Sequence, residues 1–203
     1  MSFKYYDTLS TLISGCLLLL VLFEVLNKDL SNISAILLLG LAYVLGYILN
    51  AVSGWLEPFY YRTMGGMPSD KLLSPPPKGN SKAYTGYGRI RFYQYQTAIN
   101  LLKNELDDSE ASTRKMFEKA MIYSNSAARV PDFNALFAFS RVMLTLAWVV
   151  GIILAFEYYC CWWYWLILAA VILLLWNRCK EMGYYYAKEV LVEYLKIKES
   201  ENR

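Results

Sequence analysis

Residues 30–56 read LSNISAILLLGLAYVLGYILNAVSGWL, a run of 27 residues without a charged side chain. At a rise of about 1.5 Å per residue, a helix of this length extends about 40 Å, whereas the hydrocarbon core of a bilayer is about 30 Å thick. A run this long and this apolar is typical of a transmembrane helix, which tilts or projects beyond the bilayer to accommodate its excess length. We therefore expect this segment to cross a membrane.

Three other runs have the same character. Residues 8–26 contain one charge, Glu24, residues 133–156 contain one charge, Arg141, and residues 158–177 contain none. Of the 203 residues, 57% are hydrophobic and 18% are charged, whereas soluble domains have about 45–50% and about 25%. The sequence predicts an all-α, polytopic integral membrane protein whose four transmembrane helices form two hairpins.

The connections between the runs predict the topology. Residues 27–34 and 157–161 are short, so each joins two antiparallel helices, and both hairpin tips lie on one side of the membrane. Lys and Arg number 11 in residues 57–132 and 6 in residues 178–203, against a single Lys28 in the two tips. Because cytoplasmic segments carry an excess of basic residues, the middle segment and both termini are expected in the cytoplasm. We expect a multi-pass protein of the cell inner (cytoplasmic) membrane.

The composition divides the chain into five segments. They are a first transmembrane hairpin (1–60), a Gly/Pro-rich linker (61–88), a cytoplasmic helical hairpin (89–130), a second transmembrane hairpin (131–177) and a cytoplasmic C-terminal helix (178–203). In the cytoplasmic hairpin, apolar residues recur at helical spacing from residue 89 to about 105 and again up to about 129, where Pro131 is expected to stop the second helix.

The C-terminal segment carries an apolar stripe outside the membrane. Its members are Met182, Tyr186, Val190, Tyr194 and Leu195. Such a stripe needs a partner surface, because apolar side chains at helical spacing form one face. The partner is either the 89–130 hairpin or another subunit.

Catalysis and metal binding are not expected. The chain has no histidine, which excludes a His general base, a His metal ligand and a Ser–His or Cys–His pair. The four cysteines include no C-x-x-C pair, so a zinc site is not predicted. Paired carboxylates and a nucleophile motif are also missing from the sequence. We assign no catalytic residue, no metal ligand and no cofactor, and we expect a protein that is not an enzyme.

Three polar residues within the apolar runs are candidates for a pore or another intramembrane role: Glu24, Asn50 and Arg141. Arg141 lies about 12 Å into its helix if that helix begins at Phe133. It can reach the cytoplasmic surface, form an ion pair or a carbonyl contact, or line a pore. Glu24 precedes Lys28 by four residues, a favourable order for an ion pair, and a proton or cation site is the alternative.

Small residues form a ridge on the second helix. Ala42, Gly46, Asn50 and Gly54 recur every four residues. Small side chains let helices approach closely in a membrane, and Asn50 is able to hydrogen-bond across such a contact. The pattern predicts helix packing and leaves open whether the contact lies within one chain or between chains.

A group of basic residues in the cytoplasmic hairpin is a candidate contact surface for lipid headgroups or a protein partner. Its members are Arg89, Arg91, Arg114, Lys115 and Lys119. Attraction to anionic headgroups is one explanation. Nucleic acid is a weaker one, because acidic residues are interleaved and the net charge is only +3.

Three short stretches carry a family resemblance: Tyr6-Asp7-x-x-Ser10-x-x-x-Ser14-Gly15, Tyr43-x-x-Gly46-Tyr47-Ile48-Leu49-Asn50-x-x-Ser53 and Ser140-Arg141. The first is similar to the start of small bacterial membrane proteins, in which an aromatic-Asp-x-x-Ser stretch precedes Pro-Gly, with Ser14 here in place of the proline. Such proteins accompany phage-defence genes and include the polytopic accessory proteins of type VI-B CRISPR systems. The resemblance implies a four-span accessory of bacterial antiviral defence.

The leading hypothesis for the function is a non-enzymatic homo-oligomer in the lipid bilayer. Its cytoplasmic helices would sense a partner or signal, and its spans would alter membrane permeability as a channel-like effector or accessory. A membrane scaffold that recruits a cytoplasmic protein is the first alternative. A subunit of a small-solute transporter is the second, although a single chain with four unbroken spans offers no midplane site.

Overall fold

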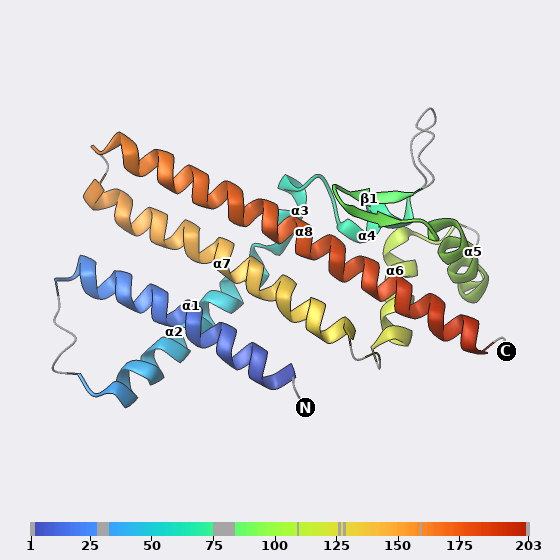
Figure 1. The fold of residues 1–203 in the computed structure, drawn as a ribbon, viewed down its shortest axis with the longest axis horizontal. Coiled ribbons are helices and arrows are strands. Elements are labelled where there is room, and N and C mark those ends of the chain that lie inside the picture. Colours follow the sequence, from blue (N-terminus) through green and yellow to red (C-terminus); the bar gives the residue numbers. More distant parts are fainter. Residues whose placement is uncertain are drawn as a thin grey trace. The chain divides into compact units, whose positions relative to one another are not determined.

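The computed structural model describes residues 3–27, 33–74, 84–108, 110–125, 127, 129–158 and 160–201. Within these ranges, four helices are long and apolar enough to cross a membrane. They are α1 (Phe3–Val25), α2 (Ala35–Trp55), α7 (Arg129–Tyr158) and α8 (Trp162–Glu201), and Figure 1 shows that the chain is built mainly from helices. The prediction of a mostly helical chain with four candidate spans is confirmed.

The chain folds into two compact units. Unit 1 comprises Met1–Tyr60 and Ala138–Cys179, and unit 2 comprises Tyr61–Phe137 and Lys180–Arg203. The helices α7 and α8 contribute residues to both units without a break. The tail from residue 178 was expected to continue the fourth span as a helix, and both segments indeed belong to one helix of 40 residues.

Glycines bring α1 and α2 into backbone contact in unit 1. A Cβ added at Gly15 would lie 1.7 Å from the carbonyl oxygen of Ala42, and one added at Gly46 would lie 1.8 Å from that of Thr11. Only a residue without a side chain fits either place, because backbone atoms cannot yield to a Cβ. The two helices therefore pack through a contact that small residues make possible.

The helices α7 and α8 form the second hairpin of unit 1 and lie side by side (Figure 1). A Cβ at Gly151 would lie 2.7 Å from a methyl group of Leu168, and the Tyr164 hydroxyl donates a hydrogen bond to the Gly151 carbonyl. A small cluster of buried side chains joins α7 to the first hairpin and consists of Leu18, Leu49, Val142 and Leu146. Each hairpin thus packs within itself, and the two meet along α7.

Unit 2 has its own hydrophobic core. The core contains α4 (Pro68–Leu73), α5 (Tyr95–Leu106), α6 (Thr113–Ser124) and the C-terminal part of α8. Its fully buried side chains include Leu72, Phe92, Leu102, Val190 and Tyr194. The apolar stripe of the C-terminal segment therefore docks within the chain, where it packs with α5 and α6.

A β-hairpin occupies part of the region for which an irregular linker and a following helix were expected. Strands β1 (Thr85–Tyr87) and β2 (Ile90–Phe92) pair antiparallel, with Gly86 opposite Arg91. Gly86 has a φ of +145°, and a Cβ there would lie 2.0 Å from the Ile90 carbonyl oxygen. Residues 90–92 alternate between buried and exposed, as expected of a strand, whose successive side chains point to opposite faces. The glycines therefore mark a hairpin instead of an irregular chain.

Three further boundaries differ from the sequence expectations. The linker range 61–88 includes α4 and the end of α3 (Glu57–Thr63), and α5 begins at Tyr95 instead of residue 89. Pro131 does not stop the cytoplasmic hairpin but lies in the first turn of α7. Proline is tolerated there, because the first N–H groups of a helix have no intrahelical partner.

Candidate functional site

An ion pair in unit 1 is the centre of the candidate site. The Arg141 guanidinium on α7 contacts the Glu57 carboxylate, where α3 begins. The two side chains are 14% and 32% exposed. Helix α2 ends at Trp55, about one turn before Pro58, because proline has no backbone N–H with which to continue the helix hydrogen bonds. This break between α2 and α3 places Glu57 beside α7.

Two hydroxyl groups lie next to this ion pair, those of Tyr60 and Thr145. The Tyr60 and Thr145 hydroxyls lie 2.9 Å apart and share a hydrogen bond, although residues 60 and 145 are 85 positions apart in the chain. Thr145 is fully buried, and its hydroxyl oxygen lies 3.0 Å from the Arg141 carbonyl, which accepts a hydrogen bond from it. We call Glu57, Tyr60, Arg141 and Thr145 the polar cluster.

The polar cluster limits what Arg141 can do. A guanidinium bound to a carboxylate presents little net charge to a passing ion, and separating the pair in a low-dielectric setting is costly. Of the three roles open to Arg141, the contacts correspond to the ion pair. The cluster joins α3 to α7.

Asn50 lies outside the polar cluster, on an exposed part of α2. It lines a small cavity of about 10 Å³ together with Ser10, Thr11, Ala138, Phe139 and Val142. A space of this size is at the lower limit for one water molecule. The cavity is therefore too small to hold a solute.

Glu24 belongs neither to the polar cluster nor to the lining of the small cavity beside Asn50. Its side chain is exposed in the last turns of α1. The predicted partner, Lys28, lies outside the residues that the structure describes. The predicted Glu24–Lys28 ion pair stays a prediction.

The small-residue ridge of α2 divides into two halves. Ala42 and Gly46 are buried against α1, whereas a Cβ at Gly54 would meet nothing within 4 Å and Asn50 is exposed. Packing within the chain therefore explains the first half of the ridge and leaves the second half unexplained.

The five basic residues do not share one surface element. Arg89 and Arg91 belong to the β-hairpin, and the Arg91 guanidinium carbon lies 4.9 Å from the centre of the Tyr84 ring. The other three residues belong to α6. There Lys119 Nζ lies 5.5 Å from the centre of the Tyr123 ring. The five basic residues therefore come from two elements, the β-hairpin and α6.

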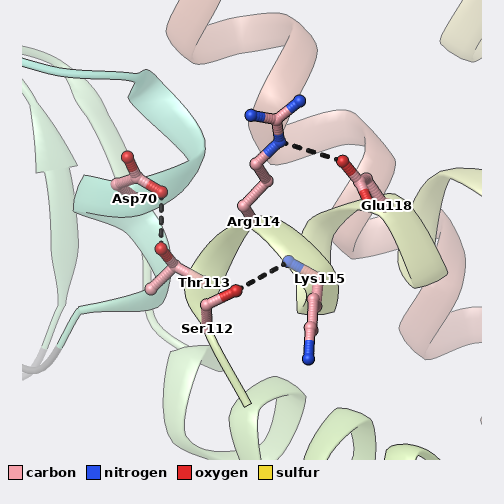
Figure 2. A network of polar contacts seen from close by, with 6 residues as sticks. All are labelled: Asp70, Ser112, Thr113, Arg114, Lys115 and Glu118. Carbon is pink, nitrogen blue, oxygen red and sulfur yellow. Dashed lines mark hydrogen bonds and ion pairs between the residues drawn. The ribbon is translucent and has the colours of Figure 1, made fainter.

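Figure 2 shows that Arg114 and Lys115 extend to opposite sides of α6. Arg114 pairs with Glu118 across one helical turn, and these side chains are 74% and 55% exposed. The hydroxyl of Ser112 accepts a hydrogen bond from the backbone of Lys115 and caps the helix. Asp70 of α4 accepts a hydrogen bond of 2.5 Å from Thr113. The contacts therefore anchor the start of α6 to α4 and leave Lys115 in solvent.

A second ion pair, which the sequence did not reveal, fastens α8 to α5 in unit 2. Lys198 Nζ lies 2.7 Å from a Glu105 oxygen and 2.6 Å from a Glu201 oxygen. It also lies 4.2 Å from the centre of the Tyr123 ring. The carboxylates of Glu105 and Glu201 raise the pKa of Lys198. These contacts fasten the C-terminal part of α8 to α5 within unit 2.

Buried tyrosines make the stability of unit 2 depend on alkaline pH. Burial, and then Tyr87, raises the pKa of Tyr184 to about 12 from 10.0. Its contribution to stability is complete below pH 10, where unfolded tyrosine is neutral, and is lost as the pH rises to about 12. We expect a loss of about 2–3 kcal/mol over this range. In a tyrosinate titration, the absorbance of the wild type minus that of Tyr184→Phe should rise near pH 12. A rise in this absorbance difference near the usual tyrosine pKa of about 10 would contradict the prediction.

Another cavity of unit 1 has no charged side chain in its lining. It measures about 330 Å³ and lies between α7 and α8. Its lining consists of Trp148, Gly151, Ile152, Ala155, Phe156, Trp165 and Leu168. A substrate site needs a few converging polar groups to orient its ligand, and this lining carries no charged side chain.

In the described ranges, no group of three or more Cys, Asp or Glu side chains is placed to hold a metal ion. All four cysteines are free thiols, with Cys160 and Cys161 exposed and Cys179 buried. The candidate site is therefore the polar cluster, a structural ion pair with two bound hydroxyls.

Comparison with family models, with curated proteins and with solved structures gives no match to this chain.

Proposed function

We propose that this chain is a non-enzymatic, oligomeric membrane protein that acts as a membrane-permeabilising or channel-like effector or accessory of bacterial antiviral defence. In this proposal, unit 2 receives a signal or a protein partner and the four spans respond. The proposal of a defence role rests on the resemblance of the three short stretches to proteins encoded with phage-defence genes.

The continuity of α7 and α8 is the observation that carries the proposal. Both helices run from the unit 2 core into the apolar segments without a loop. Val190 and Tyr194 of α8 are fully buried in that core. A helix transmits a displacement of one end because its backbone hydrogen bonds keep it stiff. A partner that repacks unit 2 would therefore act directly on two of the four spans.

The proposed orientation places unit 2 and both termini in the cytoplasm, with the spans in the inner membrane. The excess of Lys and Arg in residues 57–132 and 178–203 supports it. Exposed apolar side chains on the spans, such as Ile36 (83%), Phe156 (81%) and Leu174 (71%), support lipid as their surroundings.

Leakage of a small dye from intact cells tests the proposal. Cells that express the chain with its partner, or during infection, should take up the dye and lose membrane potential, and Arg141→Ala should change the leak several-fold, because it leaves Glu57 without its charge partner. The matched control is Arg114→Ala, because Arg114 pairs with Glu118 on an exposed helix face. It should leave the leak unchanged. No leak under any induction, with equal amounts of protein in the membrane, would contradict the proposal.

A scaffold that recruits a cytoplasmic partner is the second candidate function. Two observations favour it: unit 2 has a hydrophobic core of its own, and Ile122 of α6 is 74% exposed at its surface. A partner that copurifies with the full chain in a fixed ratio, without any leak, would support the scaffold over the channel-like effector.

A further inference from the structure

The β-hairpin of unit 2 exposes an arginine together with two tyrosines. Successive side chains of a strand point to opposite faces, and Arg91 is exposed between two buried neighbours in β2. Its guanidinium carbon lies 4.9 Å from the centre of the Tyr84 ring, and the ring centres of Tyr84 and Tyr93 are 5.6 Å apart. Tyr93 is 58% exposed, and Arg89 is exposed in the turn. We call Tyr84, Arg89, Arg91 and Tyr93 the β-hairpin patch.

The β-hairpin patch belongs to a segment without acidic residues. Between Asp70 and Glu105 the sequence has six Lys or Arg residues and no Asp or Glu, although the net charge of the whole chain is only +3. The helices that pack against the β-hairpin, α4 and α8, carry Asp70 and Glu181 near their contacts with it. Asp70 accepts a hydrogen bond from Thr113, and Glu181 directly follows Lys180. The charge of the segment therefore favours an anionic partner.

The contacts with α8 place the β-hairpin at the end of an apolar run. The uncharged residues 158–177 end three residues before Lys180 and seven before Tyr184, which corresponds to about 4.5 Å and about 10 Å along a helix. Lys180 Nζ lies 4.1 Å from the centre of the Tyr87 ring, and the Tyr87 and Tyr184 rings stack with their centres 5.2 Å apart. The headgroup layer is about 5–8 Å thick on each side of the hydrocarbon core. The β-hairpin therefore packs on the turns of α8 that lie in this layer and just beyond it.

We propose that the β-hairpin patch binds the phosphate groups of anionic lipids at the cytoplasmic surface of the membrane. Arg89 and Arg91 supply charge and hydrogen-bond donors to the lipid phosphates, for which the guanidinium group is well suited. Tyr84 and Tyr93 lie at the headgroup level, which amphipathic rings prefer. The position on α8 favours lipid over nucleic acid, because it brings the patch to the layer in which lipid phosphates are concentrated.

This inference goes beyond the proposed function, because it assigns a lipid-binding surface to unit 2 and does not require the spans to leak. It does require the apolar run of α8 to lie in a membrane. A protein that prefers anionic lipid at the β-hairpin but causes no leak would contradict only the proposed function. A leak without this preference would contradict only the lipid site.

Fluorescence quenching beside the patch measures the lipid preference in the full chain. The parent variant lacks native thiols and carries Cys16→Ala, Cys160→Ser, Cys161→Ser and Cys179→Ala. The substitution Gln94→Cys, at an exposed position next to the patch, carries the fluorophore. The protein is reconstituted in phosphatidylcholine vesicles that contain phosphatidylglycerol. Either lipid is then spin-labelled on its acyl chain close to the headgroup, so that both headgroups stay intact.

Spin-labelled phosphatidylglycerol should quench the fluorophore more strongly than spin-labelled phosphatidylcholine. The double variant Arg89→Gln/Arg91→Gln should remove most of this preference. A basic residue near an anionic surface contributes about fivefold to binding, so that two arginines account for about 30-fold at most. The matched control is Arg114→Gln/Lys115→Gln, which removes two exposed positive charges from α6 and should keep the preference.

A measurement at high salt tests the proposal without any substitution in the patch. At 1 M salt the Debye length is about 3 Å, so the preference of the parent variant should fall. Equal quenching by the two lipids in the parent variant, a preference that salt leaves unchanged, or equal losses in the two double variants would overturn the inference. Binding of a single-stranded oligonucleotide that depends on Arg89 and Arg91, without a lipid preference, would assign the patch to nucleic acid and also overturn it.

Discussion

The Gly46→Val protein is expected to lose about 3 kcal/mol or more of its unfolding free energy. A Cβ at this position would lie 1.8 Å from the Thr11 carbonyl oxygen, so α1 and α2 must separate to accept it. Overpacking a tight contact usually costs about 1–3 kcal/mol, and a collision with backbone falls at the upper end, because no side chain can rotate away. Reversible unfolding of the purified chain in mixed detergent micelles measures this loss.

Gly40→Val is the matched control for this substitution. It makes the same change on the same helix, but a Cβ there meets nothing within 4 Å. The change should cost less than about 1 kcal/mol at a protein concentration at which the chain is monomeric. Equal losses for the two variants would show that the close contact of α1 and α2 does not determine the stability of unit 1.

The Arg141→Leu protein is expected to lose about 2–4 kcal/mol. Removing one partner of a largely buried ion pair leaves the other charge uncompensated, and Glu57 is 32% exposed, which moderates the cost. The double variant Glu57→Leu/Arg141→Leu should recover most of this loss, because it leaves no charge behind. Unfolding free energies of the wild type, both single variants and the double variant form the cycle that isolates the pair.

The exposed pair Arg114–Glu118 supplies the comparison for this cycle. Its side chains are 74% and 55% exposed, and such pairs contribute little, because water already solvates both charges. Its own double-mutant cycle should give no measurable coupling. A coupling near zero for Arg141 and Glu57 as well would mean that the charges of the polar cluster do not hold α3 to α7.

The four spans could be predicted from the sequence because their signal is local. An uncharged run such as 30–56 identifies a membrane helix by length and polarity alone. The same holds for the stripe that contains Val190 and Tyr194, since helical spacing shows which side chains share a face. Which surface covers the stripe depends on the tertiary fold, and the sequence left two partners open.

The polar cluster could be predicted only in part. Arg141 stood out as a charge within an apolar run, and Glu57, at the end of another run, was a signal that could have suggested its partner. The contact depends on the break at Pro58, which sets the direction of α3. No sequence pattern connects Tyr60 with Thr145, because residues 85 positions apart meet only through the fold.

The β-hairpin of unit 2 was missed because its strands are three residues long. Strands this short contain less than two periods of alternation, so the helical spacing that begins at Phe92 dominated the pattern. The positive φ of Gly86 and Gly88 is the feature that separates a hairpin from an irregular loop. Arg89 and Arg91 therefore belong to the hairpin, whereas Arg114, Lys115 and Lys119 belong to α6.

Membrane extraction tests most directly the claim that lipid surrounds the four apolar helices. We expect the full chain to stay with the membrane pellet through alkaline carbonate and urea washes and to enter solution only with detergent. A chain that dissolves in detergent-free buffer and runs there as a single uniform species would contradict it.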